Sequence, residues 1–201
     1  MRFCTYTLGC KANQYDSQTI ERLLCERGFE HVKLGDGADI CIINTCAVTA
    51  ESVRKSKHAV RRIKKNEPFS LIAVCGCFSE LEPDVAKELD VDIIGGVKDR
   101  EAFVEELLEK FQQSHTILNS TTGSITNTSI NPISTTATTP TITTPSTTAV
   151  TTPTATNLST PSPTQRTRAL LKIQDGCDNY CTYCIIPFAR GESRSIPLEE
   201  L

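Results

Sequence analysis

Three cysteines near the carboxyl end of the chain are spaced for iron–sulfur chemistry. Cys177, Cys181 and Cys184 lie at x3 and x2 spacing in the run DGCDNYCTYC. Thiolates are the usual ligands of iron–sulfur clusters, and three of them leave one iron of a four-iron cube open, which suggests catalysis rather than electron storage. A zinc knuckle or disulfides would be the alternatives. No His follows Cys184, so the spacing favours the cluster over zinc.

The elements expected to position such side chains alternate between strands and helices up to about residue 115. Short apolar runs predict strands over residues 3–7, 39–43, 71–75 and 91–94, and apolar periodicity predicts helices over 16–27, 50–65, 79–89 and 99–111. This alternation implies an α/β fold, a parallel sheet with helices on both faces. About 115 residues suffice for such a domain with its own core.

Three further cysteines each follow a predicted strand. Cys10 comes after the first strand, Cys46 after the second and Cys77 after the third. The carboxyl ends of parallel strands lie at one edge of a sheet, where ligands usually bind, so these cysteines should meet in space. Gly9 and Gly76 precede two of them, and would let the backbone come close to a bulky cluster.

The other four cysteines lie inside predicted elements. Cys4, Cys41 and Cys75 fall in strands and Cys25 falls in a helix, which predicts small buried hydrophobic residues rather than ligands. An error of one residue in the end of the third strand would exchange the roles of Cys75 and Cys77.

The composition changes abruptly at Thr116. From there to Gln165 the chain has no charged side chain, and 27 of these 50 residues are Ser or Thr and six are Pro. Such a segment predicts a disordered linker, with an end-to-end distance of about 40 Å as a flexible coil. The expected organisation is therefore 1–115, 116–165 and 166–201. A glycosylated stalk of an extracellular, disulfide-bonded protein is a rival explanation of the same tract.

Overall charge gives no nucleic-acid signature, since 21 basic and 24 acidic residues leave a net charge of -3. We expect a cytoplasmic protein without a membrane span, because neither a signal peptide nor a run of ~18 apolar residues is evident. Any RNA contact must be local. One basic run consists of Arg54, Lys55, Lys57, His58, Arg61, Arg62, Lys64 and Lys65. It could contact phosphates or be an ordinary solvated helix face.

Residues 171–191 resemble the start of the radical S-adenosylmethionine (SAM) domain of the tRNA methylthiotransferases. Residues 7–13, 43–49 and 76–77 resemble the three motifs of that family's amino-terminal domain. The resemblance implies two [4Fe-4S] clusters, with SAM chelating the open iron of the second and Tyr183 near its adenine. The implied ligands are Cys10, Cys46 and Cys77 for the first cluster and Cys177, Cys181 and Cys184 for the second.

The resemblance also implies a reaction. The opening LGCK and the block KIQDGCDNYC are most similar to the branch that acts on N6-threonylcarbamoyladenosine beside the tRNA anticodon, and the isopentenyladenosine branch is the alternative. The family's chemistry takes an electron from a donor such as a flavodoxin or ferredoxin. It then uses a 5′-deoxyadenosyl radical to activate adenosine C2 for sulfur insertion. A non-catalytic iron–sulfur or zinc module on a long tether is an alternative from another class.

Two expectations concern the carboxyl-terminal segment. A radical SAM (β/α) barrel takes at least ~200 residues, whereas 166–201 holds only a first strand, expected at 169–174, and the cluster loop. The 201-residue chain is therefore expected to be inactive by itself. Arg190 and Arg194 could contact substrate or the SAM carboxylate, or be surface residues.

Overall fold

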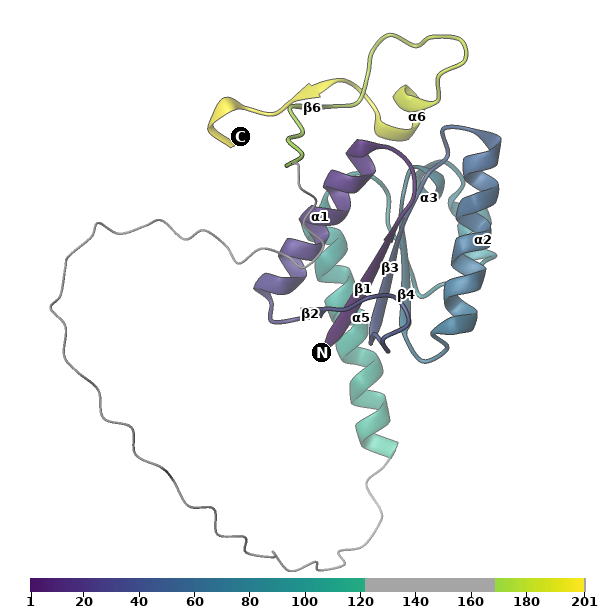
Figure 1. Ribbon diagram of the computed structural model, residues 1–201, viewed down its shortest axis with the longest axis vertical. Coiled ribbons are helices and arrows are strands. Elements are labelled where there is room, and N and C mark those ends of the chain that lie inside the picture. The colour runs from purple at the N-terminus through teal and green to yellow at the C-terminus, as the bar shows by residue number, and fades with distance from the viewer. Residues whose placement is uncertain (122–168, 201) are drawn as a thin grey trace, which may run out of the picture.

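The computed structural model describes residues 1–121 and 169–200 (Figure 1). Its centre is a parallel sheet of five strands in the order β2-β1-β3-β4-β5, as the α/β pattern predicts. The strands are β1 (Arg2–Thr7), β2 (Glu30–His31), β3 (Ile40–Thr45), β4 (Leu71–Gly76) and β5 (Ile93–Ile94). The two-residue strand β2 was not predicted, because it is too short to carry an alternating pattern.

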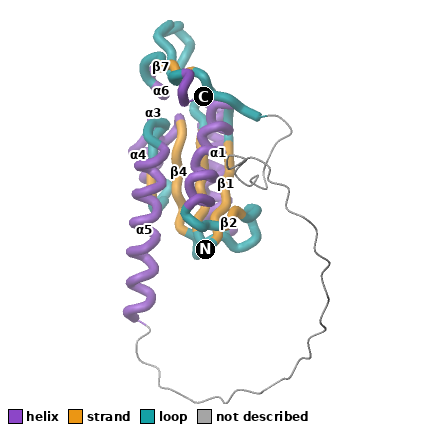
Figure 2. The backbone as a smooth tube through the Cα atoms, turned by 90° about the vertical axis from the view of Figure 1, so that its left-hand side faces the viewer, coloured by secondary structure: helices purple, strands orange, loops and turns teal. Residues whose placement is uncertain are grey.

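Helices cover both faces of the sheet, which confirms the predicted layers. They are α1 (Lys11–Glu26), α2 (Ala50–Asn66), α3 (Cys77–Leu81), α4 (Pro83–Lys87) and α5 (Arg100–Thr121). Figure 2 shows α1 and α5 across the strands on the side towards the viewer, and Figure 1 shows α2 on the opposite side. The site therefore rests on a sheet that is packed from both faces.

Alternate side chains of each strand point to opposite faces and build two apolar clusters. Phe3 and Ile42 pack with Leu24 of α1 on one face. On the other face, Ile43 packs with Val60 of α2. Burying each such side chain contributes roughly 1.5–3 kcal/mol, so the strands are held firmly up to their carboxyl ends.

Three of the predicted helices have wrong boundaries. The helix expected to begin at residue 16 begins at Lys11, five residues earlier. The helix expected over 79–89 is broken into α3 and α4, because Pro83 begins a new helix and disfavours helical geometry at Glu82. The helix expected to end at Phe111 continues to Thr121, into the range predicted as linker. The rest of that predicted linker lies outside the described residues.

The carboxyl-terminal segment contains β6 (Gln174–Asp175), α6 (Ile186–Arg190), β7 (Arg194–Ser195) and the 3-10 turn η1 (Leu198–Glu200). Of the strand expected over 169–174, only β6 forms, and it pairs antiparallel with β7. The segment lies over the edge of the sheet at which β1, β3 and β4 end (Figure 1). In the described part of the chain, no helix has both the length and the apolar character to cross a membrane.

Candidate metal centre

The first cysteine triad lies at one edge of the sheet. Cys10 immediately precedes α1, Cys46 immediately follows β3, and Cys77 is the first residue of α3 after β4. Because β1, β3 and β4 are parallel neighbours, their carboxyl ends bring the three loops together, as expected from the sequence.

The three thiols gather around Asn13, a residue that sequence reasoning missed. The carboxamide Oδ1 of Asn13 lies 3.8 Å from Cys10 Sγ and 4.0 Å from Cys77 Sγ. A methyl group placed on Gly9 would lie 3.0 Å from Cys46 Sγ and 3.1 Å from Asn13 Nδ2. Cys46 and Cys77 are buried, whereas Cys10 is exposed, so the triad opens towards solvent on one side.

Hydrogen bonds from buried side chains fix these loops. The Asn13 amide donates to the carbonyls of Leu8 and Thr45, each at 2.9 Å, which ties the ends of β1 and β3 together. Ser56 of α2 accepts from the Cys46 N–H at 3.1 Å and donates to the Cys46 carbonyl at 2.9 Å. The cysteine positions are therefore set by side chains on helices rather than by the strands alone.

Gly9 and Gly76 both adopt positive φ, at 101° and 104°. The close approach expected at these glycines is real, but its partner is the protein itself. A methyl group on Gly76 would lie 2.4 Å from the Thr45 carbonyl oxygen, and one on Gly9 would meet Cys46. The glycines let adjacent loops touch, and thereby bring the cysteines together.

Electrostatics at the triad favour the protonated thiol of Cys77. Burial raises the pKa of Cys77, the guanidinium of Arg190 lowers it, and the neighbouring thiols of Cys46 and Cys10 raise it. Negative charge on three adjacent sulfurs would require a cation or bound iron to compensate it.

The donor set fits an iron–sulfur cluster better than a single ion. In residues 1–121 and 169–200, no three His, Cys, Asp or Glu side chains are grouped so that they could hold one metal ion. A [4Fe-4S] cluster bonds each cysteine to a different iron, so its ligands stand farther apart than those of one ion. Three thiols that converge from separate loops, with one side open, are compatible with that arrangement.

The second triad occupies one surface loop between β6 and α6. The Cys177 N–H donates to the Gly191 carbonyl at 3.1 Å, and the Cys184 N–H donates to the Cys181 carbonyl at 2.9 Å. All three thiols are at least partly exposed. Tyr183 is 89% exposed, so its ring is accessible to a ligand.

Both triads lie on the same side of the domain. Helix α6 begins soon after Cys184, and its Ala189 packs against Cys77 and Val97 in a small apolar cluster. The loop carrying the second triad is thus anchored beside the first.

A largely buried group of five charged side chains holds the carboxyl-terminal segment on the domain; we call it the ionic cluster. Its members are Asp16, Arg100, Lys172, Asp175 and Arg190. The Asp16 carboxylate of α1 is at its centre and is 2% exposed. It accepts from Lys172 at 2.7 Å, from Arg100 at 3.1 Å and from Arg190 at 3.2 Å.

Arg190 connects the two cysteine sites. Its Nη1 donates at 2.8 Å to Asp175, which lies two residues before Cys177, and its Nη2 donates at 2.6 Å to Asn13 Oδ1. Burial lowers the pKa of Arg190, but the carboxylates of Asp175 and Asp16 raise it more, so the guanidinium stays charged. Arg190 is therefore a buried residue, whereas Arg194 is exposed at the surface.

The structure separates the remaining cysteines. Cys4, Cys41 and Cys75 are buried in the sheet, as predicted, and burial raises the pKa of Cys75 to about 11. The prediction that Cys25 is buried is wrong, because this residue lies on the exposed side of α1 near its end. None of the four joins either triad.

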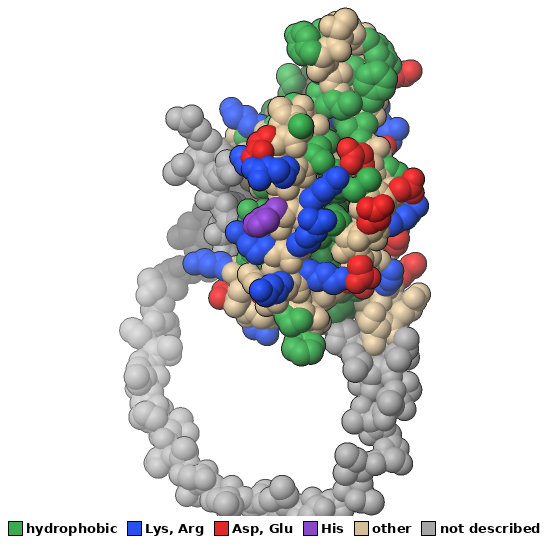
Figure 3. Space-filling view, turned by 90° about the vertical axis from the view of Figure 1, so that its right-hand side faces the viewer, with side chains coloured by type: hydrophobic (Ala, Val, Ile, Leu, Met, Phe, Trp, Pro, Cys, Tyr) green, Lys and Arg blue, Asp and Glu red, His purple; other side chains and the backbone are tan. Residues whose placement is uncertain are grey.

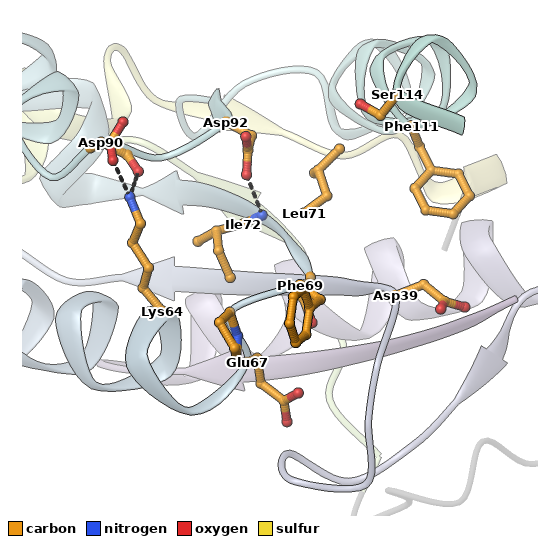
Figure 4. Close-up of a pocket in the computed structure, with 12 residues that line it drawn as sticks. Asp39, Lys64, Glu67, Phe69, Leu71, Ile72, Asp90, Asp92, Phe111 and Ser114 are labelled. Atoms are coloured by element: carbon orange, nitrogen blue, oxygen red, sulfur yellow. Dashed lines mark hydrogen bonds and ion pairs between the residues drawn. The ribbon is translucent and has the colours of Figure 1, made fainter. Parts of the chain in front are cut away.

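A cavity of about 410 Å³ lies at the opposite edge, at the amino ends of β3, β4 and β5 (Figure 4). Its charged groups already have structural partners. Asp92 accepts from the Ile72 N–H at 2.8 Å, and Lys64 pairs with Asp90. The cysteine-bearing edge is the better candidate for chemistry.

Comparisons with known proteins find relatives over nearly the whole chain. Residues 2–96 match the family described as "Uncharacterized protein family UPF0004". The chain is 34% identical over 200 residues to "Threonylcarbamoyladenosine tRNA methylthiotransferase MtaB" of Bacillus subtilis, covering 98% of this chain and 38% of that protein. It is 29% identical to the protein of the same name from Aquifex aeolicus, covering 100% and 43%.

A differently named relative is also similar. The "tRNA-2-methylthio-N(6)-dimethylallyladenosine synthase" of Clostridium perfringens is 29% identical over 212 residues, covering 99% of this chain and 40% of that protein. The chain spans about two fifths of the length of the curated relatives it matches. The similarity extends over both cysteine triads and nearly all of the chain, so the chain is similar throughout its length to part of the tRNA methylthiotransferases.

Proposed function

We propose that this protein takes part in the methylthiolation of tRNA, on N6-threonylcarbamoyladenosine next to the anticodon. The observation that carries the proposal is the convergence of two cysteine triads at one sheet edge. Arg190 links them by donating to Asn13 of α1, beside the first triad, and to Asp175 of β6, two residues before the second. Relatives named for threonylcarbamoyladenosine support this substrate, and a relative named for dimethylallyladenosine keeps the second branch as the alternative.

In this proposal the two triads hold separate [4Fe-4S] clusters. Cys10, Cys46 and Cys77 hold one, and Cys177, Cys181 and Cys184 hold the other, with SAM at its open iron. With an electron donor such as a flavodoxin or ferredoxin, these groups would supply the radical and sulfur chemistry that methylthiolation needs.

The chain's own residues have positioning roles in this scheme. Asn13 and Ser56 hold the loops of the first triad, while Arg190 and Asp175 hold the second triad's loop against them. Tyr183, exposed beside Cys184, offers an aromatic face for the adenine of SAM. Residues up to the end of α5 at Thr121 would form the sulfur-inserting domain, and 166–201 the beginning of the SAM-binding domain.

An anaerobic iron count on the 201-residue chain tests the proposal. After reconstitution with iron and sulfide we expect about eight irons per chain, because each four-iron cluster uses one triad. Cys10→Ala should reduce the count to about four, whereas Cys25→Ala removes an exposed thiol outside both triads and should leave it unchanged. Tightly bound zinc in place of iron, or equal iron losses in the two variants, would contradict the assignment.

A further inference from the structure

The outer surface of α2 is strongly basic. This helix has seven Lys and Arg residues and one acidic residue, Glu51, in a chain whose net charge is -3. Arg54, His58, Arg61 and Lys65 recur at steps of three and four residues, so they form one stripe opposite the buried face. Figure 3 shows Lys and Arg side chains, with a His among them, gathered on this side of the molecule.

Part of this charge is uncompensated. Glu51 pairs with Arg54 at 2.8 Å and lies 3.7 Å from Lys55. In the parts of the chain that the structure describes, no acidic side chain pairs with Arg61, Arg62 or Lys65, and all three are exposed. Unpaired cations of this kind attract a polyanion, because binding releases its condensed counterions.

Beside this stripe lies a cavity of about 320 Å³ between α2 and β1, which we call the basic groove. It is lined by Tyr6, Leu8, Arg54, Lys55, His58, Ala59 and Arg62. The guanidinium carbon of Arg62 lies 5.5 Å from the centre of the Tyr6 ring. An aromatic ring with an adjacent guanidinium is a platform on which an unpaired base can stack, while the surrounding cations bind phosphates.

The basic groove leads towards the first cysteine triad. Its Leu8 lies two residues before Cys10, and α2 begins four residues after Cys46. An RNA strand in the groove would therefore run along α2 towards the edge at which sulfur transfer is proposed.

We propose that the basic groove binds single-stranded RNA, with its cations on the phosphates and Tyr6 stacked on one base. The proposal names the surface through which tRNA would approach, and in naming RNA it rests on the proposed function. A membrane surface would need apolar side chains beside the cations, and an acidic peptide would have no use for the aromatic platform.

The test measures binding of a fluorescein-labelled RNA hairpin, with an unpaired loop, to the metal-free 201-residue chain by anisotropy. Arg54→Gln, Lys55→Gln and Arg62→Gln, which replace three exposed cations that line the groove, are combined in one variant. The matched control combines Arg22→Gln on α1, Arg27→Gln immediately after α1 and Lys110→Gln on α5, which removes the same charge from the opposite face. Both variants replace exposed side chains, so both should fold.

At salt concentrations between roughly 50 and 200 mM, we expect the affinity of the groove variant for the hairpin to be at least about tenfold lower than that of the unchanged chain. Its plot of log affinity against log salt should be shallower by roughly 2, the value for three lost phosphate contacts on a single strand. The control should change neither quantity. Equal losses in the two variants would overturn the proposal, since the binding would then reflect net charge alone.

Tyr6→Leu tests the base-stacking contact without changing charge. It should weaken hairpin binding about tenfold, leave the salt dependence unchanged and leave binding of a fully paired RNA duplex unchanged, whereas Tyr6→Phe should behave as the unchanged chain. The proposal would be overturned if the unchanged chain bound the hairpin and the duplex equally well. It would also be overturned if polyglutamate displaced the labelled hairpin as effectively as unlabelled hairpin does. Because the chain is metal-free here, failure would leave the iron count and the proposed clusters unaffected.

Discussion

Replacing Asp16 by Asn should destabilise the chain more than any neutralisation on its surface. The substitution keeps the side chain's shape but removes the carboxylate that accepts from Lys172, Arg100 and Arg190. Arg190 and Lys172 would still have Asp175, but Arg100, whose side chain is 9% exposed, would lose its carboxylate. Removing one partner of a buried ion pair costs about 3–5 kcal/mol, a large part of a domain's usual stability of about 5–15 kcal/mol.

The assay is urea unfolding of the metal-free chain, with the midpoint shifted and the slope unchanged. Asp90→Asn is the matched control, because Asp90 pairs with Lys64 on an exposed surface and its positive φ suits Asn. Limited proteolysis should also cut within 169–200 faster in the Asp16 variant, since Lys172 and Arg190 lose their shared anchor. A midpoint no lower than that of Asp90→Asn would refute the structural role given to the ionic cluster.

Three further outcomes are expected. Gly76→Ala should cost more than Gly28→Ala in urea unfolding, because both have positive φ but only Gly76 would also drive a methyl group into a carbonyl oxygen. Ser56→Ala should cost about 1–3 kcal/mol by leaving a buried N–H and carbonyl of the Cys46 loop unpaired, and reconstituted iron should fall towards one cluster. Lys64 lowers the pKa of Asp90, so this pair stabilises the fold above about pH 4, and its effect is lost as the pH falls further. Lys64→Gln should return the pKa of Asp90 towards its ordinary value, as measured by carbon NMR of the carboxyl group.

The sequence predicted β1, β3 and β4 well because each is a short, largely apolar run, and β3 and β4 are buried on both faces. That pattern placed Cys10, Cys46 and Cys77 just beyond strand ends, and parallel topology then required them to meet. Asn13 and Asp16 could not be found in the same way. Both are polar residues in the first turns of a helix, and polar side chains at such positions usually face solvent. Their burial depends on Arg190 and Lys172, which are more than 150 residues away along the chain.

The charge balance of the ionic cluster relates it to the neighbouring cysteines. Three cations, Arg100, Lys172 and the buried Arg190, face two carboxylates, Asp16 and Asp175. The group therefore carries one excess positive charge. That excess lies beside Cys77, where the Arg190 guanidinium already lowers the thiol pKa against the effect of burial. Cysteines must lose their protons to bind a cluster, and an adjacent buried cation makes that loss less costly. The contacts that hold the two cysteine loops together thus also supply positive charge where thiolates are needed.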